Sequence, residues 1–188
     1  MRAPGSAFLT VRSVLVLGGA RSGKSACAQS LVEAAASERL YLATAEAGDD
    51  EMAARIVRHR ADRGAGWLTR EEPLALVEAL VAEARPGRAL LVDCLTLWLS
   101  NLMLAGREVE AETARLTEAI SALRAPVVLV SNEVGLGLVP DNPLTRSFRD
   151  AQGRLNREIA AACEAVVFVA AGLPTLIKPA AGPALKLS

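Results

Sequence analysis

One stretch near the amino terminus constrains the fold more than any other. An apolar run, Val14-Leu15-Val16-Leu17, leads directly into Gly18-Gly19-Ala20-Arg21-Ser22-Gly23-Lys24-Ser25, here called the glycine loop. The apolar run is typical of a buried strand, and the Ala-rich segment 26–36 that follows is typical of a helix. Gly-x-x-x-x-Gly-Lys-Ser between a strand and a helix has the spacing of a phosphate-binding loop. A glycine turn that merely joins the two elements is the alternative, but the flanking strand and helix favour the nucleotide interpretation.

The chemistry of phosphate binding accounts for the residue types in this loop. Glycine permits backbone conformations in which successive N–H groups point at a polyphosphate, at the positive end of the following helix. Lys24 supplies a mobile charge for the β- and γ-phosphates, and the Ser25 hydroxyl is placed to bind Mg²⁺. Arg21 adds a further phosphate contact. We therefore expect the nucleotide to contact Gly18, Gly19, Ala20, Arg21, Ser22, Gly23, Lys24 and Ser25.

Length and composition exclude several classes of protein. The chain has 188 residues, which suits one domain, and we expect that domain over residues 14–180 after a disordered tail at 1–13. No apolar run approaches the roughly 18 residues needed to cross a bilayer, and residues 1–12 lack the apolar core of a signal peptide. Lys plus Arg and Asp plus Glu are equal at 21 each, which argues against a general nucleic-acid surface.

The cysteine pattern points to the cytoplasm. The chain has three cysteines, an odd number without a Cys-x-x-Cys pair, so neither a disulfide framework nor a zinc site is indicated. All three fall in predicted helices, and we expect buried, reduced thiols at Cys27, Cys94 and Cys163.

Strands and helices alternate along the chain. Apolar runs predict strands at 14–17, 40–43, 89–92, 127–130 and 166–169, with a short last one at 175–177. Helical spacing predicts helices at 26–36, 51–62, 73–84, 94–104, 109–123 and 144–163. The helix at 73–84 is expected to bury Val81, and the helix at 144–163 to bury Leu144. The nearly continuous apolar strands predict an α/β fold, a three-layer P-loop nucleotide-binding architecture with a mostly parallel sheet flanked by helices.

Ligands of such folds gather at the carboxyl ends of the strands. Thr44, Asp93 and Glu133 follow or close three predicted strands, so we expect all three near the nucleotide. Asp93 closes a strand where P-loop proteins hold Mg²⁺ through a carboxylate. An ordinary helix N-cap is the alternative for Asp93, and the glycine loop favours the metal role. Asn132 is a further candidate for this edge, and spacing indicates no role for it.

His59 is the only histidine in the chain. A lone histidine is more often a surface or packing residue than a catalyst. Four arginines surround it, however, and their charge should lower the pKa of His59 below its usual value of about 6.5 and favour the neutral, nucleophilic imidazole. These arginines are candidate phosphate ligands, although an arginine cluster on a helix is usually a solvated face; they are Arg55, Arg58, Arg60 and Arg63. We include Arg58, Arg60 and Glu71 among the candidate nucleotide-binding residues.

Besides the glycine loop, three segments carry distinctive residues. They are Asp49-Asp50-Glu51-Met52-Ala53-Ala54-Arg55-Ile56 with a histidine shortly after, Ser131-Asn132-Glu133-Val134-Gly135-Leu136-Gly137-Leu138-Val139-Pro140, and Phe148-Arg149-Asp150-Ala151-Gln152-Gly153-Arg154-Leu155-Asn156. Together with the glycine loop they resemble the bifunctional adenosylcobinamide kinase and adenosylcobinamide-phosphate guanylyltransferase family of cobalamin biosynthesis. The resemblance extends from Val14 to Lys178, and the three later segments are far more specific than the glycine loop.

The resemblance implies two reactions on one substrate. ATP or GTP first phosphorylates the aminopropanol hydroxyl of adenosylcobinamide. GTP then transfers GMP to that phosphate, which releases pyrophosphate and gives adenosylcobinamide-GDP. The family uses a guanylylated histidine in the second reaction, and His59 is the only residue here that matches it. The resemblance also implies a homotrimer, and Mg²⁺ is the expected cofactor.

Two other functions fit the residues alone. One is a different small-molecule kinase on the same fold, in which His59 is incidental. The other is a nucleotide-gated switch without a small substrate, which works through movement of the loops around Thr44 and Gly135.

Overall fold

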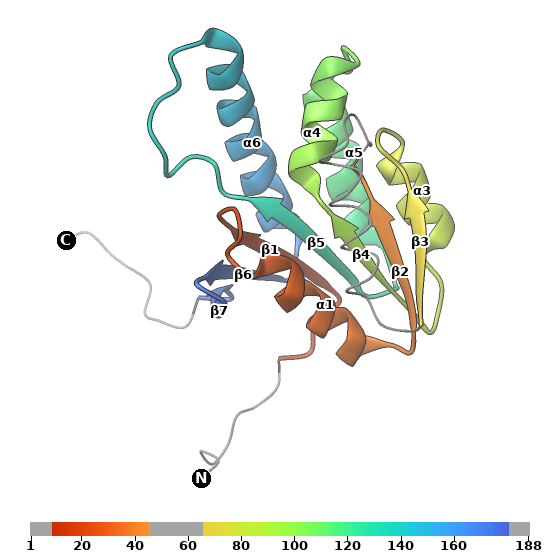
Figure 1. The fold of residues 1–188 in the computed structure, drawn as a ribbon. Helices are drawn as coiled ribbons and strands as arrows, with labels where there is room; N and C mark the ends of the chain where they lie inside the picture. The colour runs from red at the N-terminus through yellow and green to blue at the C-terminus, as the bar shows by residue number, and fades with distance from the viewer. Residues whose placement is uncertain (1–8, 46–65, 181–188) are drawn as a thin grey trace, which may run out of the picture.

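The computed structural model describes residues 9–45 and 66–180. Figure 1 shows the arrangement of the helices and strands. The strands are β1 (Ser13–Gly18), β2 (Glu38–Ala43), β3 (Trp67–Glu71), β4 (Arg88–Asp93), β5 (Val127–Asn132), β6 (Ala165–Ala170) and β7 (Leu173–Lys178). The helices are α1 (Lys24–Ala35), α3 (Leu76–Glu83), α4 (Leu95–Leu104), α5 (Val109–Ala122) and α6 (Pro143–Ala162).

The described strands form one sheet in the order β3-β2-β4-β5-β1-β6-β7. Neighbours pair in parallel except β6 and β7, which are antiparallel. The predicted mostly parallel sheet is therefore confirmed. β1 lies between β5 and β6, so the loop that follows β1 is flanked by the ends of two other parallel strands.

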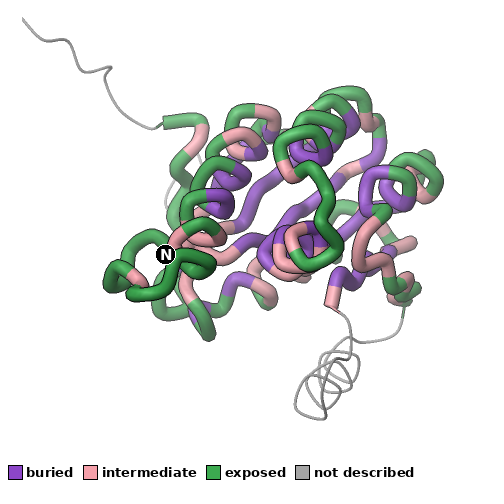
Figure 2. Tube along the Cα trace, turned by 90° about the horizontal axis from the view of Figure 1, so that it is seen from above, coloured by how far each residue is buried: buried purple, intermediate pink, exposed green. Residues whose placement is uncertain are grey.

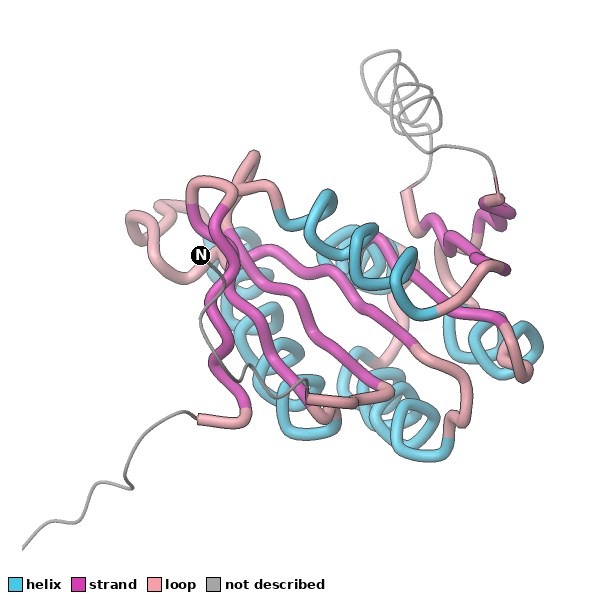
Figure 3. Tube along the Cα trace, turned by 90° about the horizontal axis from the view of Figure 1, so that it is seen from below, coloured by secondary structure: helices cyan, strands magenta, loops and turns pink. Residues whose placement is uncertain are grey.

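Helices cover both faces of the sheet, as predicted. α1 packs on one face, against β1, β4, β5 and β6, while α3, α4, α5 and α6 pack on the other (Figures 1 and 3). Successive residues of β1 alternate between two apolar clusters, because side chains along a strand point to opposite faces. Figure 2 shows the resulting pattern, with buried chain in the strands and on the inner sides of the helices.

Two helix residues expected in the core are exposed. In α3 the buried stripe consists of Leu76, Val77, Ala79 and Leu80, and Val81 is 59% exposed. The prediction was wrong because the buried face of α3 is centred on Leu76, Val77 and Leu80, and Val81 points to one side of it. In α6 Leu144 is 71% exposed, because the first turn of this helix extends past the ends of the strands (Figure 1).

The prediction missed β3 altogether. Its sequence, Trp-Leu-Thr-Arg-Glu, has no continuous apolar run, and its burial is only partial because it is an edge strand. Trp67 anchors it to β2 through an edge-to-face contact with Tyr41, with ring centroids 6.4 Å apart. Edge strands of this kind do not show the apolar pattern on which sequence analysis relies.

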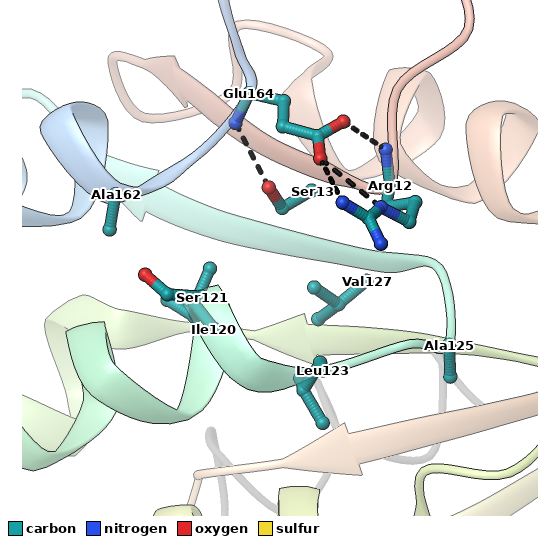
Figure 4. A pocket seen from close by; sticks show the side chains of 9 residues that line it. All are labelled: Arg12, Ser13, Ile120, Ser121, Leu123, Ala125, Val127, Ala162 and Glu164. Carbon is teal, nitrogen blue, oxygen red and sulfur yellow. Dashed lines mark hydrogen bonds and ion pairs between the residues drawn. The ribbon is translucent and has the colours of Figure 1, made fainter.

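The first strand begins before the predicted boundary at Val14. Ser13 belongs to β1, and the backbone N–H and guanidinium of Arg12 donate to the Glu164 carboxylate at 2.7 to 3.2 Å (Figure 4). Residues 12 and 13 of the expected tail at 1–13 are therefore held by the ion pair and the strand. Residues 1–8 lie outside the described part of the chain. The Arg12–Glu164 pair borders a pocket of about 210 Å³ at the amino ends of β1 and β5, opposite the glycine loop.

All three cysteines are free thiols. Cys27 lies in α1 and is half-buried, whereas Cys94 directly precedes α4 and Cys163 directly follows α6, both buried. Burial raises the pKa of the Cys163 thiol to about 12, so this thiol stays protonated. Within residues 9–45 and 66–180, no helix combines the length and apolarity needed to span a bilayer.

Candidate active site

The backbone of the glycine loop has the shape of an anion cradle. Arg21 and Gly23 have positive φ values of 55° and 93°. Alternating left-handed residues turn successive N–H groups to the same side, which makes a concave anion site. Gly23 is also the N-cap of α1, and no side chain caps the N–H groups of the first turn there. A phosphate at this position would therefore accept hydrogen bonds from the backbone N–H groups that have no partner at the start of a helix.

The base of the loop is tightly packed and its tip is open. A Cβ atom on Gly18 would lie 2.5 Å from the Val169 carbonyl oxygen in β6, too close for any side chain. A Cβ atom on Gly19 would meet nothing within 4 Å. The loop is thus fixed where it leaves β1, while its tip has room for a ligand.

Lys24 and Ser22 are polar residues of the loop with little exposed surface. The Lys24 ammonium donates to the Gly19 carbonyl oxygen at 3.1 Å, although the residue is only 9% exposed. The Ser22 hydroxyl is buried without a hydrogen-bond partner, which costs free energy unless a ligand or water pairs with it. These groups fit a bound phosphate, which would offer several acceptor oxygens.

Thr44 supports the end of β4 and has no surface to offer a nucleotide. The residue is completely buried. Its hydroxyl donates to the Cys94 carbonyl oxygen at 2.7 Å and accepts the Cys94 N–H at 2.9 Å. The hydroxyl thus both donates and accepts a hydrogen bond within the protein. We infer that the Thr44 side chain supports the backbone next to Asp93 and does not make the expected contact with the nucleotide.

Asp93 ends β4 at the same edge of the sheet. The N-cap of α4 is Cys94 rather than Asp93, and Cys94 makes no side-chain cap, so the capping alternative for Asp93 does not hold. The pKa of the Cys94 thiol is raised to about 11, mainly by burial and also by the Asp93 carboxylate, while the Lys24 ammonium acts to lower it. The charges of Lys24 and Asp93 therefore both act on this buried thiol.

A buried polar cluster holds the end of β5. The Ser131 hydroxyl donates to Asn156 at 2.7 Å, and the Gln152 amide donates to both of these residues at 2.9 Å. The Asn156 amide in turn donates to the Asn132 carbonyl oxygen at 3.0 Å, while the Thr96 hydroxyl accepts the Asn132 N–H at 2.8 Å. α4 and α6 thus fix β5 beside the glycine loop.

Sequence reasoning did not assign Gln152 and Asn156 to the site. They interrupt the buried apolar face of α6 at positions i and i+4, and both are buried. Polar residues on such a face require partners, and this was the one signal in the sequence that could have singled them out.

The remaining predicted residues differ in position. The Glu133 N–H donates to the Gly18 carbonyl oxygen at 3.1 Å, and its carboxylate accepts the Gly135 N–H at 2.6 Å, so the side chain is used within its own loop. Glu71 ends β3, four strand spacings from β1, or roughly 19 Å across the sheet. Glu71 thus lies apart from the glycine loop, and its contact with another part of the nucleotide stays a prediction. The predicted helix at 51–62, with Arg58, His59 and Arg60, lies outside the described residues.

Two oxygen ligands for Mg²⁺ are expected from the protein, Ser25 and Asp93. Among the described residues, no group of three or more His, Cys, Asp and Glu side chains could hold a metal ion. Mg²⁺ in P-loop sites needs only one or two protein oxygens, because water and phosphate supply the others. The Ser25 hydroxyl in the first turn of α1 and the Asp93 carboxylate at the end of β4 are suitable oxygen ligands.

Comparison with known proteins decides the family. Residues 14–177 match the family model of cobinamide kinase / cobinamide phosphate guanyltransferase. The chain is 51% identical over 166 residues to the bifunctional adenosylcobalamin biosynthesis protein CobP of Pseudomonas aeruginosa, which covers 87% of this chain and 96% of that protein. It is 41% identical over 180 residues to CobU of Salmonella typhimurium, over 88% of this chain and 99% of the relative.

The chain belongs to the cobinamide kinase / cobinamide phosphate guanyltransferase family. The match to this family runs from β1 into β7 and includes both the glycine loop and the polar cluster of α6. A solved structure of a prototypical ATPase from the type III secretion system of pathogenic bacteria is similar in fold, with a TM-score of 0.51 at 12% identity. That similarity covers 84% of this chain and 50% of the ATPase chain, and it confirms the P-loop type of fold for this family member.

Proposed function

We propose that this protein phosphorylates adenosylcobinamide with ATP or GTP and then transfers GMP from GTP to adenosylcobinamide phosphate. The observation that carries the proposal is the glycine loop, with Lys24 folded over it and the Ser22 hydroxyl unpaired, in a member of this family. The site binds a triphosphate in each reaction, and only the phosphorus atom that is attacked differs.

In the first reaction, the substrate hydroxyl attacks the γ-phosphorus of ATP or GTP. A P–O bond forms, the bond between the γ-phosphorus and the bridging oxygen breaks, and the nucleoside diphosphate leaves. Lys24 and the N–H groups at the start of α1 stabilise the charge on the phosphate oxygens, because catalysis of phosphoryl transfer is mainly positioning and charge stabilisation. Arg21, exposed at the tip of the loop, contributes a further phosphate contact.

In the second reaction, the His59 imidazole attacks the α-phosphorus of GTP, and pyrophosphate leaves. A phosphate oxygen of adenosylcobinamide phosphate then attacks the same phosphorus and releases the imidazole, which gives adenosylcobinamide-GDP. Covalent catalysis of this kind divides one difficult displacement into two easier ones. The same loop would stabilise the departing pyrophosphate, and Arg58 and Arg60 flank His59 in sequence as further phosphate ligands.

Mg²⁺ would be held by the Ser25 hydroxyl and the Asp93 carboxylate. It would neutralise charge on the triphosphate oxygens. Thr44 would then serve the site indirectly, through the backbone on which Asp93 stands.

We also propose that the protein acts as a homotrimer in the cytoplasm. Three large apolar residues on the edge strand β7 are exposed, as expected for a contact surface: Leu173, Leu176 and Ile177. The free thiols agree with a reducing compartment.

GTP labelled at the α-phosphate tests the proposal. With Mg²⁺ alone, we expect a covalent, acid-labile and base-stable protein adduct and release of pyrophosphate. Addition of adenosylcobinamide phosphate should transfer the label to adenosylcobinamide-GDP. γ-Phosphoryl transfer to a small alcohol alone would instead indicate a different kinase, and slow hydrolysis alone a nucleotide-gated switch.

A further inference from the structure

The turn between β6 and β7 has a demanding backbone conformation. Ala170 pairs with Leu173, so Ala171 and Gly172 form a two-residue hairpin turn. Their φ values are 51° and 80°. Positive φ at both central positions is the pattern of a type I′ turn, which suits hairpin twist but strains any residue other than glycine or asparagine.

This turn lies directly against the glycine loop. The Gly172 N–H donates to the Ser22 carbonyl oxygen at 2.8 Å. A Cβ atom placed on Gly23 would lie 3.1 Å from the Gly172 Cα, so the two backbones are in close contact. Segments about 150 residues apart in sequence are thus joined through main-chain atoms.

The hydrogen bond fixes the orientation of the peptide between Ser22 and Gly23. In a phosphate-binding loop, carbonyl groups must point outward so that the N–H groups can point at the ligand. An outward carbonyl at this packed position needs a donor, because an unpaired buried acceptor is costly. Gly172 supplies that donor from outside the loop.

We propose that the β6–β7 turn is a brace for the glycine loop and that Gly172 is a positioning residue for nucleotide binding. The brace holds the Ser22–Gly23 peptide in its binding orientation before the nucleotide arrives, which lowers the ordering cost of binding. The proposal rests on the proposed function only in taking the ligand to be a nucleoside triphosphate.

Gly87 provides a matched control. Its φ is 84°, against 80° for Gly172, and a Cβ atom on either residue would meet nothing within 4 Å. Gly87 precedes β4 at the amino ends of the strands, away from the loop. Gly172→Ala and Gly87→Ala should therefore impose similar backbone strain and lower the melting temperature by similar amounts.

The two variants should differ in nucleotide affinity. We expect Gly172→Ala to raise the Kd for GTP with Mg²⁺ by about fivefold, because the turn moves to relieve the left-handed strain on alanine. The Kd is measured by calorimetry in a His59→Ala background, in which no guanylyl adduct forms. Gly87→Ala should leave that Kd unchanged. Equal Kd values for both variants would overturn the brace.

A second substitution acts in the opposite direction. Ala171→Asn creates Asn-Gly, the favoured pair for a type I′ turn, so it should raise the melting temperature and bind GTP at least as tightly as the wild type. Weaker GTP binding by this variant would contradict the proposal. This test holds even if Gly172→Ala fails to fold.

Amide exchange gives a readout for single sites in the chain. If the brace and the nucleotide support each other, GTP should slow exchange of the Gly172 N–H more than that of the Gly87 N–H. No difference between the two amides would refute the coupling. Failure of the wild type to bind GTP would overturn the proposed function and the brace together. Normal binding by the wild type with equal Kd values for the two variants would overturn the brace alone.

Discussion

The Thr44 side chain holds both backbone groups of Cys94, donating to its carbonyl oxygen at 2.7 Å and accepting its N–H at 2.9 Å. Asn101 secures Thr44 in turn, because its amide donates to the Thr44 carbonyl oxygen at 2.8 Å. The residue directly before Cys94 is Asp93, the proposed Mg²⁺ ligand. The Thr44 hydroxyl thus holds the backbone next to Asp93, whose carboxylate is the proposed Mg²⁺ ligand.

Thr44→Val should therefore impair the protein far more than Thr44→Ser. Valine keeps the shape but leaves the Cys94 N–H and carbonyl unpaired in the interior, so we expect a loss of about 2 kcal/mol in the free energy of unfolding. Serine keeps the hydroxyl and should lose less. Urea unfolding and kinase assays across Mg²⁺ concentrations measure both effects, and equal losses for the two variants would show that the methyl group matters rather than the hydroxyl.

Asp93→Asn should shift the Mg²⁺ requirement of both reactions. The change is nearly isosteric, so the melting temperature should move little, while the Mg²⁺ concentration for half-maximal activity should rise by at least about tenfold. Asp150→Asn, on the exposed side of α6, is the matched control and should leave the titration unchanged. Coincident titrations for wild type and Asp93→Asn would remove Asp93 from the metal site.

His59→Ala should separate the two reactions. The kinase reaction needs no protein nucleophile, so adenosylcobinamide phosphate should still form at a substantial fraction of the normal rate. The guanylyl adduct and adenosylcobinamide-GDP should be absent, because alanine cannot form the phosphorus bond. Lys24→Ala, by contrast, should abolish both reactions. Adduct formation at the wild-type level in His59→Ala would mean that another residue is the nucleophile.

Acid should weaken the protein partly through Glu38. Hydrogen bonds from Arg88 and Arg85 hold the pKa of Glu38 below its ordinary value of 4.5. A lowered carboxylate pKa contributes stability above the unfolded-state pKa, and this contribution is lost as the pH falls through the folded-state pKa. Glu38→Gln should lower the melting temperature at pH 7, and the difference from wild type should shrink below about pH 4.5.

The parts of the fold that follow from local chemistry were predictable. The glycine loop, its strand and its helix are specified by about twenty consecutive residues, because the loop conformation is a property of that backbone. The buried parallel strands were equally clear, since a strand covered on both faces is apolar at every position. The order of the strands in the sheet is a tertiary property that no local pattern specifies.

The supporting residues were not predictable for the same reason. Thr44 meets its partner 50 residues away, and Gln152 meets Ser131 across 21 residues, so neither sequence neighbourhood reveals the role. The predicted contact of Glu71 with the nucleotide stays a prediction, since Glu71 ends the edge strand β3. β3 itself was missed because an edge strand can be polar, and the exposure of Leu144 depends on how far α6 extends past the sheet.

The contact between Gly18 and the Val169 carbonyl divides the glycines of the loop into two kinds. Gly18 is required by the neighbouring strand whether or not a nucleotide ever binds. A library that randomised the loop and was selected only for folded protein would still recover glycine at position 18, while position 19 would drift freely. The glycines of a phosphate loop thus meet two separate requirements, one set by the packing of the fold and one set by the substrate.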